Sequence, residues 1–168
     1  MAVSQETREE HLNIESITWG DLTWVNIEHP TRLEADYLGK HYPFHPFDLD
    51  DCLSRTQRPK LDEYKDYLFF IFHFPVYNKI TRVSTHGQVS VFIGDKYLIT
   101  LHSGELKSLI RLFRDCQTSE KTRQANFSSG SGYLLYRIMD RAVDSYFPVI
   151  DKIFSLAEDI EDVVFDER

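Results

Sequence analysis

The chain is predicted to have an α/β fold, in which a mixed sheet is followed by a long C-terminal helix. Three observations carry this prediction. The run 67–76 is apolar on consecutive positions, which is typical of a strand buried on both faces. Amphipathic helix patterns lie before and after that strand. Finally, apolar residues return at helical spacing over 132–165, which indicates a helix of about 50 Å at 1.5 Å per residue.

The strand signals divide into an N-terminal pair and a later group of four. After a loose end at residues 1–12, the patterns occur at 12–17, 22–27, 60–64, 67–76, 88–93 and 96–101. Gly94-Asp95 joins the last two, and glycine there can adopt the dihedral angles of a tight hairpin turn. We therefore expect these two strands to form a hairpin.

Two short helices are expected between the two groups of strands. Thr31 and Glu34 have the spacing of a capping box, and the apolar face that follows ends at Gly39. A second helix starts at Pro46, because proline suits the first helical position. Asp48 then lies in the first turn, near the positive end of the helix dipole.

The C-terminal part predicts an amphipathic helix, a polar connection and the long helix. The amphipathic helix follows Gly104, and the polar segment 117–132 is expected to be a loop. Pro148 removes a backbone donor and should kink the long helix. We expect an α/β body at 1–117, a flexible connection at 118–131 and the start of a stalk helix at 132–168. Since no stop signal is visible near residue 168, the helix is expected to continue in a longer protein.

Composition excludes several classes of protein. The net charge of −8, without a run of Lys or Arg, argues against a nucleic-acid binder. The two cysteines stand alone, so a disulfide framework is improbable and the cytosol is the better compartment. The run 67–76 is far shorter than the roughly 20 residues that cross a bilayer. An acidic surface instead suits cations or basic partners.

A dense group of carboxylates is the first candidate site. Asp48, Asp50 and Asp51 lie within one short segment, and oxygen ligands suit Mg²⁺, which keeps several waters and accepts one or two carboxylates. The alternative is a helical turn that complements its own dipole, and the spacing alone favours that alternative.

An acidic stripe on the long helix is the second candidate site, and two other functions are kept as alternatives. Asp140, Asp144, Asp151 and Glu158 share one side of the long helix, which is usually a solvated face. No catalytic pair is evident. A soluble metal-dependent phosphohydrolase, built on the first acidic group with His45, is kept as an alternative of another class. A plain interaction scaffold on the apolar seam 146–164 is a third.

Three stretches together resemble the cytoplasmic domain of the CorA family of divalent-cation transporters. The first is His45-Pro46 with Asp50-Asp51 and Leu53, running into Gln57-Arg58-Pro59-Lys60, Tyr64 and Tyr67-Leu68-Phe69. The second joins Val89–Ile93 to Tyr97–Thr100. The third combines Tyr133–Tyr136 with Asp140, Val143-Asp144 and Tyr146-Phe147.

The resemblance implies an α/β/α sandwich on the cytosolic side of the cell membrane, a stalk helix and a homopentamer. It also implies that Mg²⁺ bound between neighbouring copies regulates a pore. Asp51 matches the acidic body residue of that interface, with Asp50 beside it, and Asp140 matches an acidic stalk position, with Asp144 one turn further. These four residues are the expected metal ligands.

The sequence also departs from the family pattern. Thr56 stands where the family often has His, and Ser145 replaces a frequent acid. The membrane helices and the Gly-Met-Asn signature of the pore are absent, so transport is not expected of this chain by itself. The resemblance does not identify the transported ion, because similar proteins move Zn²⁺, Co²⁺ or Ni²⁺.

Overall fold

The computed structural model describes residues 12–54, 57–77 and 84–166. In this part of the chain, six strands form one sheet of order β1-β2-β6-β5-β4-β3. All neighbouring strands are antiparallel except β2 and β6, which are parallel. The strands are β1 (Glu15–Trp19), β2 (Leu22–Glu28), β3 (Lys60–Glu63), β4 (Leu68–Tyr77), β5 (Ser84–Ile93) and β6 (Tyr97–His102). The predicted mixed sheet is confirmed.

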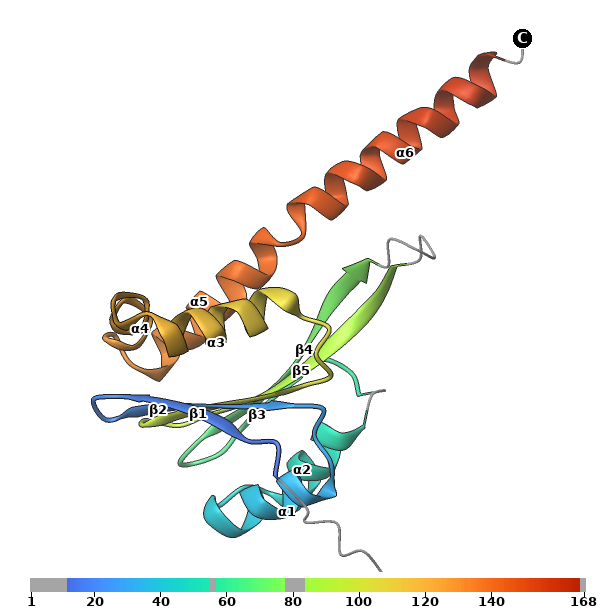
Figure 1. Cartoon of the computed structure of the whole chain (residues 1–168). Helices are drawn as coiled ribbons and strands as arrows, with labels where there is room; N and C mark the ends of the chain where they lie inside the picture. The colour runs from blue at the N-terminus through green and yellow to red at the C-terminus, as the bar shows by residue number, and fades with distance from the viewer. Residues whose placement is uncertain (1–11, 55–56, 78–83, 167–168) are drawn as a thin grey trace, which may run out of the picture.

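Helices cover both faces of the sheet (Figure 1). Helices α1 (Arg32–His41) and α2 (Pro46–Leu53) lie on one face. Helices α3 (Lys107–Thr118), α4 (Glu120–Phe127) and α5 (Ser131–Asp144) lie on the other. This is the expected α/β/α sandwich, and helix α6 (Phe147–Asp166) projects away from it.

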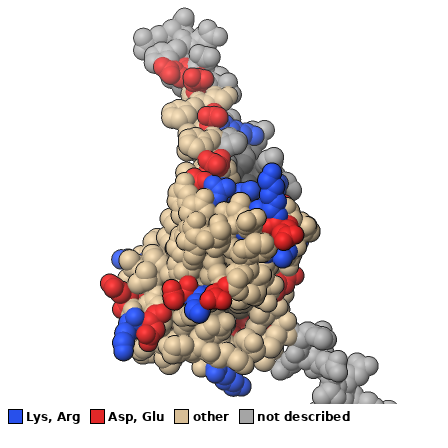
Figure 2. Space-filling model, turned by 90° about the vertical axis from the view of Figure 1, so that its left-hand side faces the viewer, with Lys and Arg blue, Asp and Glu red and all other residues tan. Residues whose placement is uncertain are grey.

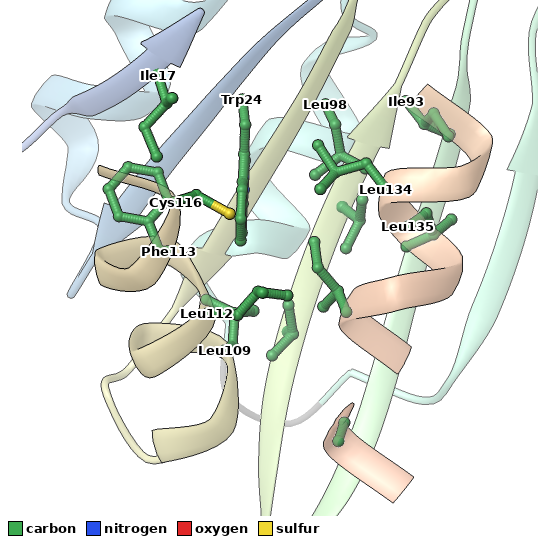
Figure 3. Close-up of a cluster of buried hydrophobic side chains, with 14 of the residues drawn as sticks. Ile17, Trp24, Ile93, Leu98, Leu109, Leu112, Phe113, Cys116, Leu134 and Leu135 are labelled. Carbon is green, nitrogen blue, oxygen red and sulfur yellow. The ribbon is translucent and has the colours of Figure 1, made fainter. Parts of the chain in front are cut away.

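The larger core lies between the sheet and helices α3 to α5 (Figure 3). Trp24 of β2 is fully buried there and meets the ring of Phe113 edge to face, with 4.9 Å between ring centroids. Its indole N–H donates to the Thr100 hydroxyl at 3.0 Å, so the one polar atom of this large side chain is satisfied. Leu134 and Leu135 bring α5 onto the same core.

The second core lies between the sheet and helices α1 and α2. Phe44, from the segment that joins these helices, stacks on Phe92 of β5 with 4.0 Å between ring centroids. The capping box at the start of α1 is confirmed, since Thr31 and Glu34 exchange the expected hydrogen bonds. A carboxylate oxygen of Glu34 also accepts from the backbone N–H of Asn13 at 3.0 Å, so the cap fastens the chain before β1 to this helix.

The long C-terminal helix is not continuous. Helix α5 ends at Asp144, and α6 starts at Phe147 after a turn at Ser145 and Tyr146. The break adjoins Pro148, which has no backbone N–H to bond to the residue one turn earlier. The kink predicted from this proline is confirmed, whereas the single rod over 132–165 is wrong. Helix α6 has 20 residues and is therefore about 30 Å long.

The polar segment before α5 is helical, which corrects the expectation of a loop. Helix α4 occupies Glu120–Phe127, and the Ser119 hydroxyl caps its N-terminus by accepting from Thr122 N–H. Phe127 is 3% exposed and belongs to the larger core. The sequence of this short helix is only weakly amphipathic, because its buried residues are Asn126 and Phe127. A helix of this length depends on tertiary packing for its stability.

The loss of Phe127 should therefore cost much of the stability of the fold. We expect Phe127→Ala to lower the free energy of unfolding by about 3–5 kcal/mol, because it leaves a cavity in the core. Phe147 is 58% exposed, so Phe147→Ala is the matched control and should cost less than about 1 kcal/mol. Urea denaturation of the chain measures both, and equal losses would contradict the placement of α4.

His102, at the end of β6, is held in its neutral form. It is 3% exposed, its Nε2 atom bonds to Asn26 Oδ1 at 3.0 Å, and its Nδ1 atom accepts from Gly104 N–H at 3.0 Å. An imidazole with one donor and one acceptor nitrogen fits this pair of partners. Burial lowers the pKa of His102 to about 4.

This buried imidazole should make stability depend on pH. The unfolded chain takes up a proton at His102 near pH 6.5, whereas the native state does so only near pH 4, so acid favours unfolding over that range. From pH 7.5 to pH 5.5 we expect a loss of about 1 kcal/mol from this residue. Urea denaturation at both pH values, compared with His102→Gln, isolates the contribution. An equal loss in the variant would contradict it.

Candidate metal site

Helix α2 carries the first group of expected ligands, and local sequence explains where it starts. Pro46 occupies the first turn, and the ring of His45 accepts from Phe47 N–H at 3.3 Å. Leu49 and Cys52 face the core below the sheet. The helix predicted from Pro46 is confirmed, and His45 serves as its cap.

Asp51 lies near the C-terminal end of α2, beside the edge of the sheet. Its side chain is 20% exposed, and its Oδ2 atom is 2.7 Å from the ammonium nitrogen of Lys60. Lys60 starts β3, which is an edge strand of the sheet. Asp51 is therefore accessible to solvent, but its Oδ2 atom already forms an ion pair with Lys60.

Lys60 has two more carboxylates around it. Its Nζ atom is 2.5 Å from Asp62 Oδ2 and 3.8 Å from Asp48 Oδ1, and it lies 5.1 Å from the centroid of the Phe69 ring. Burial by itself lowers the pKa of Lys60, but the hydrogen bonds to Asp51 and Asp62 outweigh it and raise the pKa above its ordinary value. The ammonium is thus firmly charged in this position.

Asp48 is a buried carboxylate rather than an open ligand. It is 1% exposed, and the Tyr67 hydroxyl donates to its Oδ2 atom at 3.1 Å. The same hydroxyl accepts from the backbone N–H of His45 at 2.8 Å. Burial raises the pKa of Asp48, and the hydrogen bonds from Tyr64 and Tyr67 oppose that rise. Asp48 therefore ties the start of α2 to the sheet.

Asp50 points away from Asp48 and Asp51 toward the first helix. Its carboxylate pairs with the Arg32 guanidinium of α1, and its side chain is 54% exposed. Asp48 and Asp51 therefore lie near Lys60, whereas Asp50 pairs with a different cation. A phosphohydrolase would need them to face one ion together, and the structure does not bring them into that arrangement.

The second pair of expected ligands lies on the other face of the sheet. Asp140 is on α5, where Arg137 approaches it at 3.3 Å, and Asp144 is exposed at the end of the same helix. Since α2 and α5 are on opposite sides of the sheet (Figure 1), one chain does not bring the four acids together. Among the described residues, no group of three or more acidic, histidine or cysteine side chains is arranged to hold a metal ion.

The acidic side chains on the surface of α2 nevertheless fit part of the ligand set of a magnesium ion. Mg²⁺ keeps several waters and takes only one or two carboxylates from a protein. Asp51 provides one partly exposed carboxylate, with the exposed Asp50 beside it.

Acidic side chains also follow the projecting helix (Figure 2). Asp151, Glu158 and Glu161 of α6 are exposed, as expected for a solvated face. Apolar side chains of α6 are exposed as well, among them Phe154 at 65% and Ile160 at 65%. Large exposed apolar groups that form a patch often mark a surface that contacts another protein.

The sequence did not predict that Lys60 and Tyr67 would contact the acidic residues of this site. Both occur in the stretch from Gln57 to Phe69 that resembles the CorA family. Their relation to Asp48 and Asp51 depends on strand pairing, since β3 lies against β4. The family pattern was the one signal in the sequence that could have drawn attention to them.

With fold and site in place, the chain can be assigned to a class of proteins. It matches the family of CorA-like Mg²⁺ transporter proteins over residues 19–168. The chain therefore belongs to this family, which is one of transporters. Within the described residues, no helix combines the length and apolar character needed to cross a bilayer.

Individual relatives agree with the family. The chain is 32% identical over 154 residues to YfjQ of Bacillus subtilis, covering 90% of this chain and 46% of that protein. It is 26% identical over 141 residues to the cobalt/magnesium transport protein CorA of Methanocaldococcus jannaschii, covering 84% of this chain and 43% of that protein. The chain thus spans less than half the length of these relatives.

Solved structures show the same fold. The soluble domain of CorA from Methanocaldococcus jannaschii superimposes with a TM-score of 0.72 at 26% identity, over 87% of this chain and 56% of that one. The full-length CmaX protein gives a TM-score of 0.68 at 16% identity, over 88% of this chain and 43% of that one, and so shares the fold alone. The expected CorA-like fold is confirmed.

The Tyr67 hydroxyl should contribute measurably to stability. Tyr67→Phe removes one hydrogen bond from the buried Asp48 carboxylate and removes the hydroxyl that accepts from the His45 N–H, so we expect a loss of about 1–3 kcal/mol. Tyr136 is 54% exposed, and Tyr136→Phe should change stability by less than about 0.5 kcal/mol. Urea denaturation of both variants tests this, and a neutral Tyr67→Phe would contradict the role of the hydroxyl.

Proposed function

We propose that this chain is the cytoplasmic regulatory part of a CorA-like magnesium transporter, whose pore is formed by segments outside this sequence. The observation that carries the proposal is the family match over residues 19–168. The match covers nearly the whole chain, while the chain covers less than half of its relatives. In this proposal the chain faces the cytosol at the cell membrane, senses divalent cations and gates the pore.

The ion is proposed to be Mg²⁺, held by the acids on α2 and α5. Asp51 and Asp50 offer oxygen ligands at the surface of one helix, and Asp140 and Asp144 offer them on the other. Carboxylate oxygens suit hard cations, whereas Zn²⁺ usually takes cysteine or histidine. Cys52, the cysteine on α2, is buried, so this helix presents oxygen atoms.

Assembly is proposed to be a homo-oligomer, a pentamer in the full-length protein. Large apolar side chains are exposed along α5 and α6, where another copy could cover them. They are Tyr133, Tyr136, Val143, Phe147, Ile150, Ile153, Phe154 and Ile160. Electrostatic repulsion opposes this assembly, because each copy carries a net charge of −8.

A divalent cation between copies would reduce this repulsion and favour the closed arrangement. When the intracellular concentration of the ion falls, the sites empty and repulsion favours a splayed arrangement of the copies. The ion can shift this equilibrium only by its higher affinity for the closed state. Carboxylates on opposite faces of the sheet suit this role, because each can meet a different neighbour.

Asp51 is the residue whose replacement tests the proposal. In the full-length protein, Asp51→Asn should raise the Mg²⁺ concentration that half-inhibits transport by about tenfold, because a ligand carboxylate is lost. The measurement is Mg²⁺ uptake into vesicles that contain increasing internal Mg²⁺.

Asp21→Asn is the control for the change of charge. Asp21 is at the turn between β1 and β2, and its side chain is 85% exposed. Its replacement should leave the inhibition unchanged. If Asp51→Asn and Asp21→Asn behave alike, Asp51 has no part in sensing the ion.

A further inference from the structure

The ammonium group of Lys60 lies among three carboxylates that come from one helix and one strand. Asp48 and Asp51 approach its ammonium from α2, and Asp62 approaches from β3. The shortest distances, 2.5 Å to Asp62 and 2.7 Å to Asp51, are those of charge-assisted hydrogen bonds. The Phe69 ring closes another side of the same position.

An ammonium at this place opposes the binding of a second cation. It neutralises part of the negative charge, and it already uses the Oδ2 atom of Asp51. A divalent ion on that carboxylate would meet the positive charge of Lys60 a few ångströms away, in surroundings less polar than water. Binding of the ion to Asp51 is therefore favoured when the lysine withdraws.

The structure provides a position for the withdrawn lysine. Lys60 and Asp62 are two residues apart on β3, so their side chains share one face of the strand. The Lys60 side chain is 32% exposed and that of Asp62 is 38% exposed, so both are partly open to solvent at the sheet edge. Lys60 can release Asp51 and keep its bond to Asp62.

We propose that Lys60 is an internal competitor for the divalent cation at Asp51, and that it sets the concentration at which this site fills. The inference rests on the proposed function, since it takes Asp51 as a ligand. It adds the residue that tunes the site: Lys60 lowers the affinity of Asp51 for the ion, and Asp62 retains the lysine when the ion binds.

The test uses the full-length protein in detergent and follows the rise of its Tm with added Mg²⁺. Lys60→Met keeps an apolar stem against Phe69 and removes the charge. It should lower the Mg²⁺ concentration that gives half of the rise by about fivefold, the factor for an ion pair of this exposure. Lys60→Arg retains the charge and should stay close to the unchanged protein.

Asp62→Asn provides a test that keeps the lysine. Without its second partner, Lys60 should hold Asp51 more tightly, and more Mg²⁺ should be needed. Asp66→Asn, in the exposed turn after β3, removes the same charge nearby and should have a smaller effect. Equal effects of these two variants would overturn the role of Asp62, and this comparison remains decisive if Lys60→Met does not fold.

The variants separate this inference from the proposed function. If Lys60→Met leaves the Mg²⁺ dependence unchanged or weakens it, while Asp51→Asn weakens it, the lysine is no competitor and Asp51 is still a ligand. If Asp51→Asn has no effect, either alone or combined with Lys60→Met, the proposed ligand itself is wrong. Competition requires that Lys60→Met strengthen binding and that Asp51→Asn abolish this gain.

Discussion

The two apolar faces of the central strands constrain everything else in this molecule. On β4, Phe69 and Ile71 face one core, while Phe70 and Phe72 face the other. Both faces must be removed from water, so helices have to lie on both sides of the sheet. That requirement places α2 below the sheet and α5 above it (Figure 1). As a result, the acids on these two helices are kept apart within one chain.

In the proposed oligomer, this separation has a functional meaning. A site closed within one chain would respond to the ion without any change in assembly. Carboxylates on opposite faces can instead serve two different boundaries with neighbouring copies, so ion binding and arrangement of the copies become linked. The break at Ser145 and Tyr146 divides the helix packed on the sheet from the exposed α6.

The sheet edge beside α2 combines stability with the proposed means of regulation. Asp48 is buried and bonded to Tyr67, so it fixes the helix in place. Asp51, one turn further, is partly exposed and bonded to Lys60. One helical turn therefore carries a structural carboxylate and a candidate ligand. Their different burial, rather than their chemistry, gives them different roles.

The sequence by itself determined the local elements and the family. The capping box at Thr31 and Glu34, Pro46 at a helix start and the apolar run of β4 each depend on neighbouring residues, and each was predicted correctly. Helix α4 was missed because Phe127 stabilises it through contacts distant in sequence. Tertiary structure alone showed that Lys60 lies among Asp48, Asp51 and Asp62. Periodicity assigns a residue to a face of its own strand or helix, whereas packing of β3 beside α2 decides which charges meet.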